Sequence, residues 1–148
     1  AVAACALLLM RRLRRPAPPV IISAEEEARE ALGALRRDAL PSQGRVLDFY
    51  VRLSDIVRRY VERRFGIRAP EQTTQEFLVE ASRHPMIVEG HQVLLAGFLR
   101  TADRVKFAAE RPAEGECARA FDAASGFVDE TAERGTPGTP DNASEVRR

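Results

Sequence analysis

The sequence is poor in the residue types that usually carry chemistry. In 148 residues it has no tryptophan, two cysteines, two histidines and one lysine beside 22 arginines. It contains no glycine-rich phosphate loop, no GxSxG motif and no HExxH or paired CxxC spacing. Cys5 and Cys117 lie in quite different segments, so we expect no disulfide framework. These absences favour a protein that is not an enzyme.

The two histidines and Cys117 are the remaining candidates for chemistry. His84 and His91 are seven positions apart across Pro85, and no cysteine or carboxylate stands at a metal-ligand spacing from them. Cys117 falls in a predicted amphipathic helix with no histidine at a recognisable catalytic interval, which is typical of a half-buried packing residue. We therefore expect no catalytic residue, no metal and no other cofactor.

Charge is distributed unevenly along the chain. The formal net charge is +1, but residues 16–133 carry 16 basic and 20 acidic groups. Nucleic-acid-binding domains usually show a basic excess, because phosphates supply most of their affinity. Residues 50–66, YVRLSDIVRRYVERRFG, hold five arginines and two acids. A helical nucleic-acid-binding domain that uses this stretch is therefore the alternative to the function inferred below.

The first ten residues, AVAACALLLM, are wholly apolar and are followed at once by RRLRRP. Ten helical residues span only about 15 Å, half of a hydrocarbon core. Because the chain begins with alanine and the arginines follow the apolar stretch, as in a stop-transfer segment, we expect the end of a longer transmembrane helix. The positive-inside rule then places the following domain in the cytoplasm. A buried amino-terminal helix is the alternative.

Apolar residues recur at three- and four-residue spacing in five later segments, which predicts an all-α fold. The expected helices cover residues 24–39, 46–65, 74–84, 87–110 and 116–133. We expect 1–15 to be the end of the anchor with its basic cluster and 16–22 to be a Pro-rich linker. A compact bundle of about five helices at 23–133 follows, and 134–148 is expected to be a disordered tail.

Local signals mark several helix ends. Ser23 with Glu26 and Thr73 with Glu76 match the capping box, and Gly66 is suited to the position just after a helix. Pro112 and Gly115 are expected to break the chain before the last helix.

The helix at 46–65 is predicted to be central, because its apolar surface is too broad for a single stripe. We expect its arginines to pair at helical spacing, Arg52 with Asp48, and Arg58 and Arg59 with Asp55 and Glu62. Residues 45–68 hold seven arginines and three acids, whereas 114–133 hold six acids and one arginine. These two helices are expected either to pack side by side or to mark two poles of a partner surface.

For the helix at 87–110 we expect an inward face that includes Ala109 and is extended by Val88, Leu94 and Phe107. Asp103 and Lys106 are expected to pair on its outer side.

Three stretches carry a family resemblance: FYVRLSDIVRRYVERRFG at 49–66, APEQTTQEFL at 69–78 and ADRVKFA at 102–108. Over about residues 28–131 the chain resembles small single-pass membrane proteins of bacterial Bat aerotolerance-type gene clusters. Those clusters also encode MoxR-like AAA+ ATPases and von Willebrand A domain proteins. The resemblance implies an inner-membrane protein with a cytoplasmic helical domain, and it brings no catalytic residues.

The function expected on these grounds is a membrane-anchored, non-enzymatic adaptor or assembly component. Its possible partners are the MoxR-like ATPase and the von Willebrand A proteins, without nucleic acid or a small-molecule substrate. The candidate partner-binding residues are Arg58, Arg59, Arg63, Arg64, Asp103 and Lys106.

Overall fold

The computed structural model describes residues 22–134, which form five α-helices and no strand. The helices are α2 (Ala24–Asp38), α3 (Val46–Phe65), α4 (Thr74–Arg83), α5 (Glu89–Phe107) and α6 (Glu114–Glu133), with short 3-10 turns η1 (Pro41–Gln43) and η2 (Ala69–Glu71). The predicted all-α bundle is confirmed for this part of the chain. The predicted anchor, nearly all of the linker and the tail lie outside the described residues.

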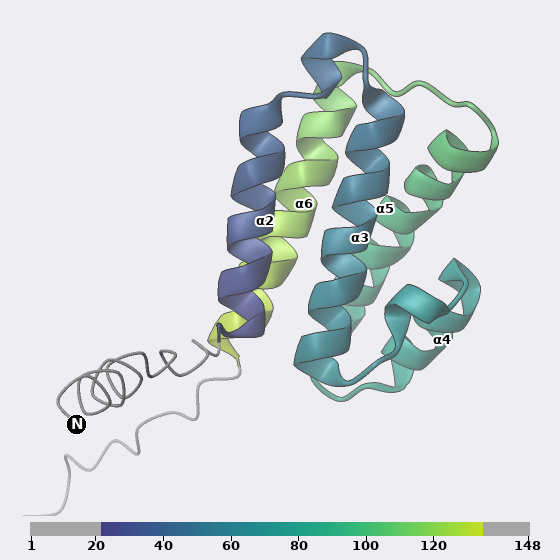
Figure 1. The fold of residues 1–148 in the computed structure, drawn as a ribbon. Helices are drawn as coiled ribbons and strands as arrows, with labels where there is room; N and C mark the ends of the chain where they lie inside the picture. The colour runs from purple at the N-terminus through teal and green to yellow at the C-terminus, as the bar shows by residue number, and fades with distance from the viewer. Residues whose placement is uncertain (1–21, 135–148) are drawn as a thin grey trace, which may run out of the picture.

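Four of the helices, α2, α3, α5 and α6, form an up-down-up-down bundle, and α4 packs beside α5 (Figure 1). Each of the four contacts the next around the ring, and α3 also contacts α6 across it. Tyr60 of α3 lies beside Thr131 of α6, and Tyr50 lies beside Cys117. Therefore α3 and α6 run in the same direction. Within residues 22–134, no helix is long and apolar enough to cross a bilayer.

The helix ends follow the local signals. Both predicted capping boxes are present, at Ser23 with Glu26 and at Thr73 with Glu76. Gly66 ends α3 at a φ of 70°, a left-handed conformation that glycine adopts without steric cost. Ala39 ends α2 in the same region, at a φ of 46°.

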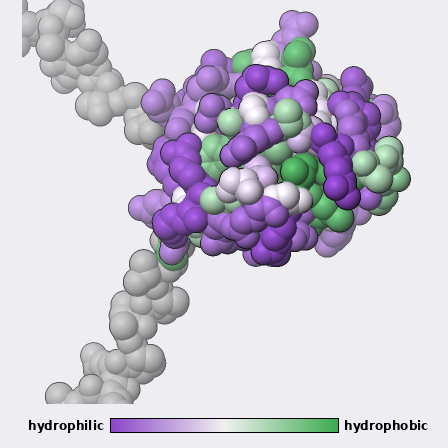
Figure 2. Space-filling view, turned by 90° about the horizontal axis from the view of Figure 1, so that it is seen from above, coloured by the Kyte–Doolittle hydropathy of each residue, from purple (hydrophilic) through white to green (hydrophobic). Residues whose placement is uncertain are grey.

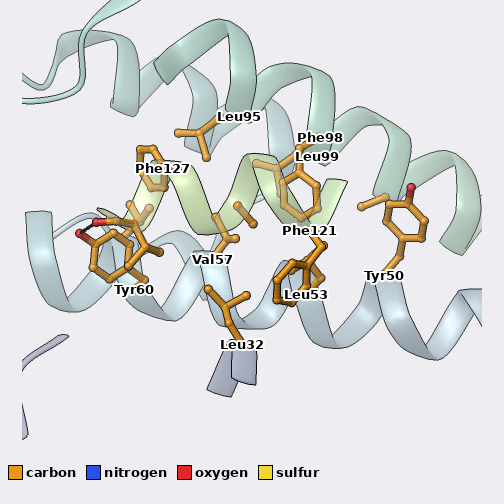
Figure 3. Packing of buried hydrophobic residues seen from close by; sticks show 14 of the residues in the cluster. Leu32, Tyr50, Leu53, Val57, Tyr60, Leu95, Phe98, Leu99, Phe121 and Phe127 are labelled. Carbon is orange, nitrogen blue, oxygen red and sulfur yellow. Dashed lines mark hydrogen bonds between the residues drawn. The ribbon is translucent and has the colours of Figure 1, made fainter. Parts of the chain in front are cut away.

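The core lies between α3, α5 and α6, with α2 closing one side (Figure 3). Tyr60 and Phe127 meet edge to face with their ring centres 5.9 Å apart. The Thr131 hydroxyl donates to the Phe127 carbonyl at 2.6 Å, so the Tyr60 hydroxyl donates to the Thr131 oxygen at 2.7 Å. The buried apolar side chains labelled in Figure 3 are Leu32, Tyr50, Leu53, Val57, Tyr60, Leu95, Phe98, Leu99, Phe121 and Phe127.

The predicted inward face of α5 was wrong at its ends. Phe107 is 84% exposed, because it comes two residues after the buried Val105 and so lies about 200° around the helix from it. The helix ends at Phe107, and Ala109 is exposed in a left-handed turn at a φ of 53°. Val88 is the N-cap residue of α5 and is 40% exposed. Leu94 does pack partly against the core, as predicted.

The break expected at Gly115 was also misplaced. Helix α6 begins at Glu114, so Gly115 lies in its first turn. The Glu116 carboxylate accepts a hydrogen bond from the Ala113 backbone N–H at 2.9 Å and closes that end.

The end of the bundle at which α3 begins is mostly hydrophilic, with small hydrophobic areas between the charged side chains (Figure 2). Leu47, in the first turn of α3, is half exposed at this end.

Candidate functional site

The four candidate arginines stand on the last two turns of α3, but the structure gives them different surroundings. Arg58 is turned inward. Its guanidinium donates to the carbonyl oxygens of Ala69 at 2.7 Å and Gln72 at 3.0 Å, and to the Thr74 hydroxyl at 2.9 Å. It also lies over the Phe77 ring, 5.6 Å from its centre. Arg58 thus holds the η2 turn and the start of α4 against α3.

Burial has an electrostatic cost for this cation. It lowers the pKa of Arg58, and the nearby carboxylates of Asp103 and Asp55 oppose that shift. Asp103 therefore lies close enough to α3 to act on Arg58 rather than standing apart as a surface contact. No ion pair joins Asp103 to Lys106 within residues 22–134, which corrects the predicted outer pair.

Arg63 and Arg64 tie the end of α3 to the start of α2. Arg63 pairs with Glu27, and Arg64 pairs with Glu25 at 3.0 Å. Arg64 and Glu25 are 22% and 16% exposed, and Arg64 also donates to the Thr131 carbonyl at 3.3 Å. Arg64 is therefore mainly a structural link between α2, α3 and α6.

Arg59 is the candidate that stays available. It is exposed, and within residues 22–134 its side chain forms no recorded hydrogen bond or ion pair. It lines a groove of about 420 Å³ between α2 and α3. We call this hollow the α2–α3 groove; its lining residues are Ala24, Glu27, Ala28, Ala31, Ala34, Arg52, Asp55, Ile56, Arg59, Tyr60 and Arg63.

The two walls of the α2–α3 groove differ in chemistry. On α2, four alanines leave only methyl groups beside the single carboxylate of Glu27. On α3, Arg52, Arg59 and Arg63 recur at intervals of seven and four residues and so lie on one stripe of the helix, with the carboxylate of Asp55 between the first two. Ala31, three residues after the buried Ala28, also lies in this groove. A shallow apolar strip beside a row of guanidinium groups suits an amphipathic surface with carboxylates along one side.

The predicted ion pairs inside α3 were wrong. Arg52 pairs with Asp38 of α2 at 2.5 Å, and Asp48 pairs with Arg45 at 2.8 Å. The arginines of α3 that form ion pairs to another helix reach the acids of α2 and not those of α6. Packing of α3 beside α6 is confirmed, but charge complementarity is not what joins them in residues 22–134.

Lys106 lies far from the α2–α3 groove. It lines a smaller hollow of about 300 Å³ where the start of α3 meets the end of α5. Of the six candidate residues, the structure therefore brings only Arg59 and Arg63 together at one concave surface.

Three of the groups that could do chemistry, Tyr50, Cys117 and His91, are buried. Burial raises the pKa of Tyr50 to about 12 and also raises the pKa of the Cys117 thiol, which disfavours a nucleophilic thiolate. Cys117 is fully buried and not half-buried as predicted. His91 is buried, with its Nε2 2.8 Å from the Glu130 carboxylate and its ring against Phe127. In the part of the chain that the structure describes, no group of three potential ligands could hold a metal ion.

Comparisons with protein-family models, with curated proteins and with solved structures found no match to this chain.

Proposed function

We propose that the chain is a membrane-anchored, non-enzymatic adaptor or assembly component and that the α2–α3 groove is its contact surface. Its partners in this proposal are a MoxR-like AAA+ ATPase and von Willebrand A domain proteins of the bacterial inner membrane, as the sequence resemblance implies. The helical domain would lie on the cytoplasmic side.

The exposure of Arg59 supports the choice of the α2–α3 groove as the contact surface. Arg58 and Arg64 are used to hold the fold together, whereas Arg59 is exposed beside an alanine-lined groove. An exposed arginine can be reversed in charge without removing an internal contact, and arginine is enriched at the centres of protein interfaces.

The ion pairs of α3 bear on the alternative function, nucleic-acid binding by residues 50–66. Three of the five arginines there, Arg52, Arg63 and Arg64, are paired with acids of α2. Phosphate binding would have to compete with those carboxylates, because affinity for nucleic acid depends on the number of cations that phosphates neutralise. This favours a protein partner.

The test is a pull-down in mild detergent from native membranes, comparing the wild-type chain with Arg59→Glu and with Arg100→Glu. Arg100 is an exposed arginine on α5 outside the groove and serves as the matched control. We expect Arg59→Glu to reduce capture of the ATPase or von Willebrand A protein by about tenfold, with unchanged helicity and melting temperature. Arg100→Glu should capture as the wild type does.

Equal capture by all three chains would remove the groove as the contact surface. Recovery of nucleic acid without either protein, lost at high salt, would favour the alternative.

A further inference from the structure

Two ion pairs cross the α2–α3 groove, one near each end. Glu27 pairs with Arg63 at the end where α2 begins, and Asp38 pairs with Arg52 at the other end. The stretch between the two pairs is about 16 Å long, because α2 rises about 1.5 Å per residue. This stretch is the part of the groove that can hold an occupant without breaking either pair.

Between the two ion pairs, the groove has one cation and one carboxylate without an internal partner. Arg59 and Asp55 are exposed, and within residues 22–134 their side chains form no hydrogen bond or ion pair. They stand four residues apart on α3, about 6 Å along the helix. Because α2 and α3 are antiparallel, counting inward from the first ion pair brings Ala31 level with Arg59 and Ala34 nearly level with Asp55 (Figure 1). The two free charges thus face alanine methyl groups across the groove.

The last turn of α6 lies at the end of the bundle where α2 begins (Figure 1). The Thr131 carbonyl accepts a hydrogen bond from Arg64 at 3.3 Å, and Arg64 pairs with Glu25 in the first turn of α2. The residues that follow Arg134 are therefore joined to the bundle next to this end of the groove.

The segment 135–148, GTPGTPDNASEVRR, lies outside the described residues, and its sequence complements the free charges of the groove. Glu145, Val146 and Arg147 place an acid, an apolar residue and a base in consecutive positions. In an extended chain, side chains two positions apart point to the same side, about 7 Å from each other, and the side chain between them points the other way. Residues 1–21 contain no acid, so they offer no counterpart for Arg59.

We propose that residues 145–147 of the same chain occupy the α2–α3 groove. In this contact Glu145 faces Arg59 and Arg147 faces Asp55, while the valine between them packs on the alanine methyl groups of α2. The inference rests on the proposed function in treating the groove as a contact surface, and it adds a regulation of that surface. A partner protein has to displace this segment before it can bind.

The direction and the length of the chain allow this contact. Arg59 is nearer than Asp55 to the end of the bundle from which the segment comes, and Glu145 precedes Arg147, so the two orders of charge agree. Eleven residues lead from Arg134 to Glu145, and they span up to about 36 Å when extended. The rise from the end of α3 to Arg59 is only about 9 Å, and one helix is about 10 Å wide. The segment therefore reaches the groove with length to spare.

The tether makes a small contact sufficient. A short flexible linker gives an effective concentration in the millimolar range, so the contact forms at an affinity that would be too weak between separate molecules. No existing ion pair has to break, because Arg59 and Asp55 have no partner within residues 22–134. Both pairs that cross the groove stay intact.

The test is disulfide trapping in the full chain in mild detergent, with the intramolecular disulfide followed by mass spectrometry. Cys5→Ser removes one native thiol, and Cys117 is buried. One variant combines Val146→Cys with Ala31→Cys in the groove. Its matched control combines Val146→Cys with Val93→Cys, which is 68% exposed on α5 at nearly the same height in the bundle. We expect the groove variant to cross-link at least about tenfold faster than the control at about 50 mM NaCl, with a smaller advantage at about 500 mM NaCl.

A charge swap gives the decisive result. Adding Arg59→Glu to the groove variant should reduce its rate to that of the control, because two carboxylates then face each other. Adding Glu145→Arg as well should restore most of the advantage. Equal rates for the cysteines at Ala31 and Val93 would overturn the contact. A rate that Arg59→Glu leaves unchanged, or that the second reversal does not restore, would also overturn it.

These outcomes are separable from those of the pull-down. If cross-linking shows no preference for the groove while Arg59→Glu still loses the ATPase or von Willebrand A protein, the internal contact is refuted and the adaptor function stands. If the groove is preferred but the wild-type chain captures neither protein, the adaptor function fails and the internal contact stands. Where both hold, Glu145→Arg alone should raise capture by about threefold, because it releases the groove.

Discussion

At the scale of single residues, neighbouring arginines of α3 have opposite roles. Arg58 satisfies the Ala69 and Gln72 carbonyl oxygens in a part-buried position, whereas Arg59 projects into the α2–α3 groove. In the sequence the two are adjacent and look alike. Their difference arises because successive residues of a helix point about 100° apart, so only one of them can face the η2 turn.

This difference predicts unequal effects on stability. Arg58→Met should lower the free energy of unfolding by about 1–3 kcal/mol, because part-buried acceptors lose their donor. Arg59→Met should change it by no more than about 0.5 kcal/mol, as expected for an exposed site. Urea unfolding followed by circular dichroism measures both. Equal destabilisation by the two changes would show that Arg58 does not hold the η2 turn.

At the scale of helices, hydrogen bonds between residues within one turn set the helix ends. Ser23 and Thr73 cap α2 and α4 with side chains that accept backbone N–H bonds, and Glu76 completes its box. Hydrogen bonds from the Thr73 backbone and hydroxyl lower the pKa of Glu76. Such motifs act over three residues, which is why the sequence located these ends correctly.

The two left-handed helix ends predict opposite responses to exchange of glycine and alanine. Gly66→Ala should destabilise the domain and Ala39→Gly should stabilise it, each by about 1 kcal/mol, because a Cβ is strained at positive φ. Gly97→Ala is the control: it lies inside α5, a Cβ there meets no atom within 4 Å, and it should stabilise by about 0.5–1 kcal/mol. Thermal melts followed by circular dichroism measure all three. Stabilisation by Gly66→Ala would contradict the left-handed end of α3.

At the scale of the whole molecule, the bundle controls the ionisation of both tyrosines. Burial raises the pKa of Tyr50 to about 12, with the nearby Cys117 and Glu116 adding to the shift. Burial also raises the pKa of Tyr60, although the hydrogen bond to Thr131 opposes this shift. Because the chain has no tryptophan and only these two tyrosines, tyrosinate absorbance reports on the core without interference.

The native protein should therefore show little tyrosinate absorbance at 295 nm at pH 10, the usual tyrosine pKa, where the chain in guanidinium is half ionised. A raised pKa means that the fold favours the protonated phenol. The stability due to Tyr50 is thus fully present below about pH 10 and is lost as the pH rises towards about 12. Identical titrations of the native and unfolded chains would contradict the buried positions of the tyrosines.

The sequence by itself determined the helices of this protein and most of their ends. Apolar residues repeat with the period of a helix, and caps act on backbone groups within one turn, so this information is local. The prediction was wrong at Phe107, which lies about 200° around α5 from the buried Val105 and is 84% exposed.

Only the tertiary structure decided which charges meet. Helical spacing predicted Asp48 as the partner of Arg52, but the structure pairs Arg52 with Asp38 of α2; the arginines of α3 could as well have paired with the acids of α6. Long guanidinium side chains bond whichever carboxylate or carbonyl the packing of helices brings within reach. The packing of α2 against α3 therefore selected the acids that α3 uses and left Arg59 exposed in the groove.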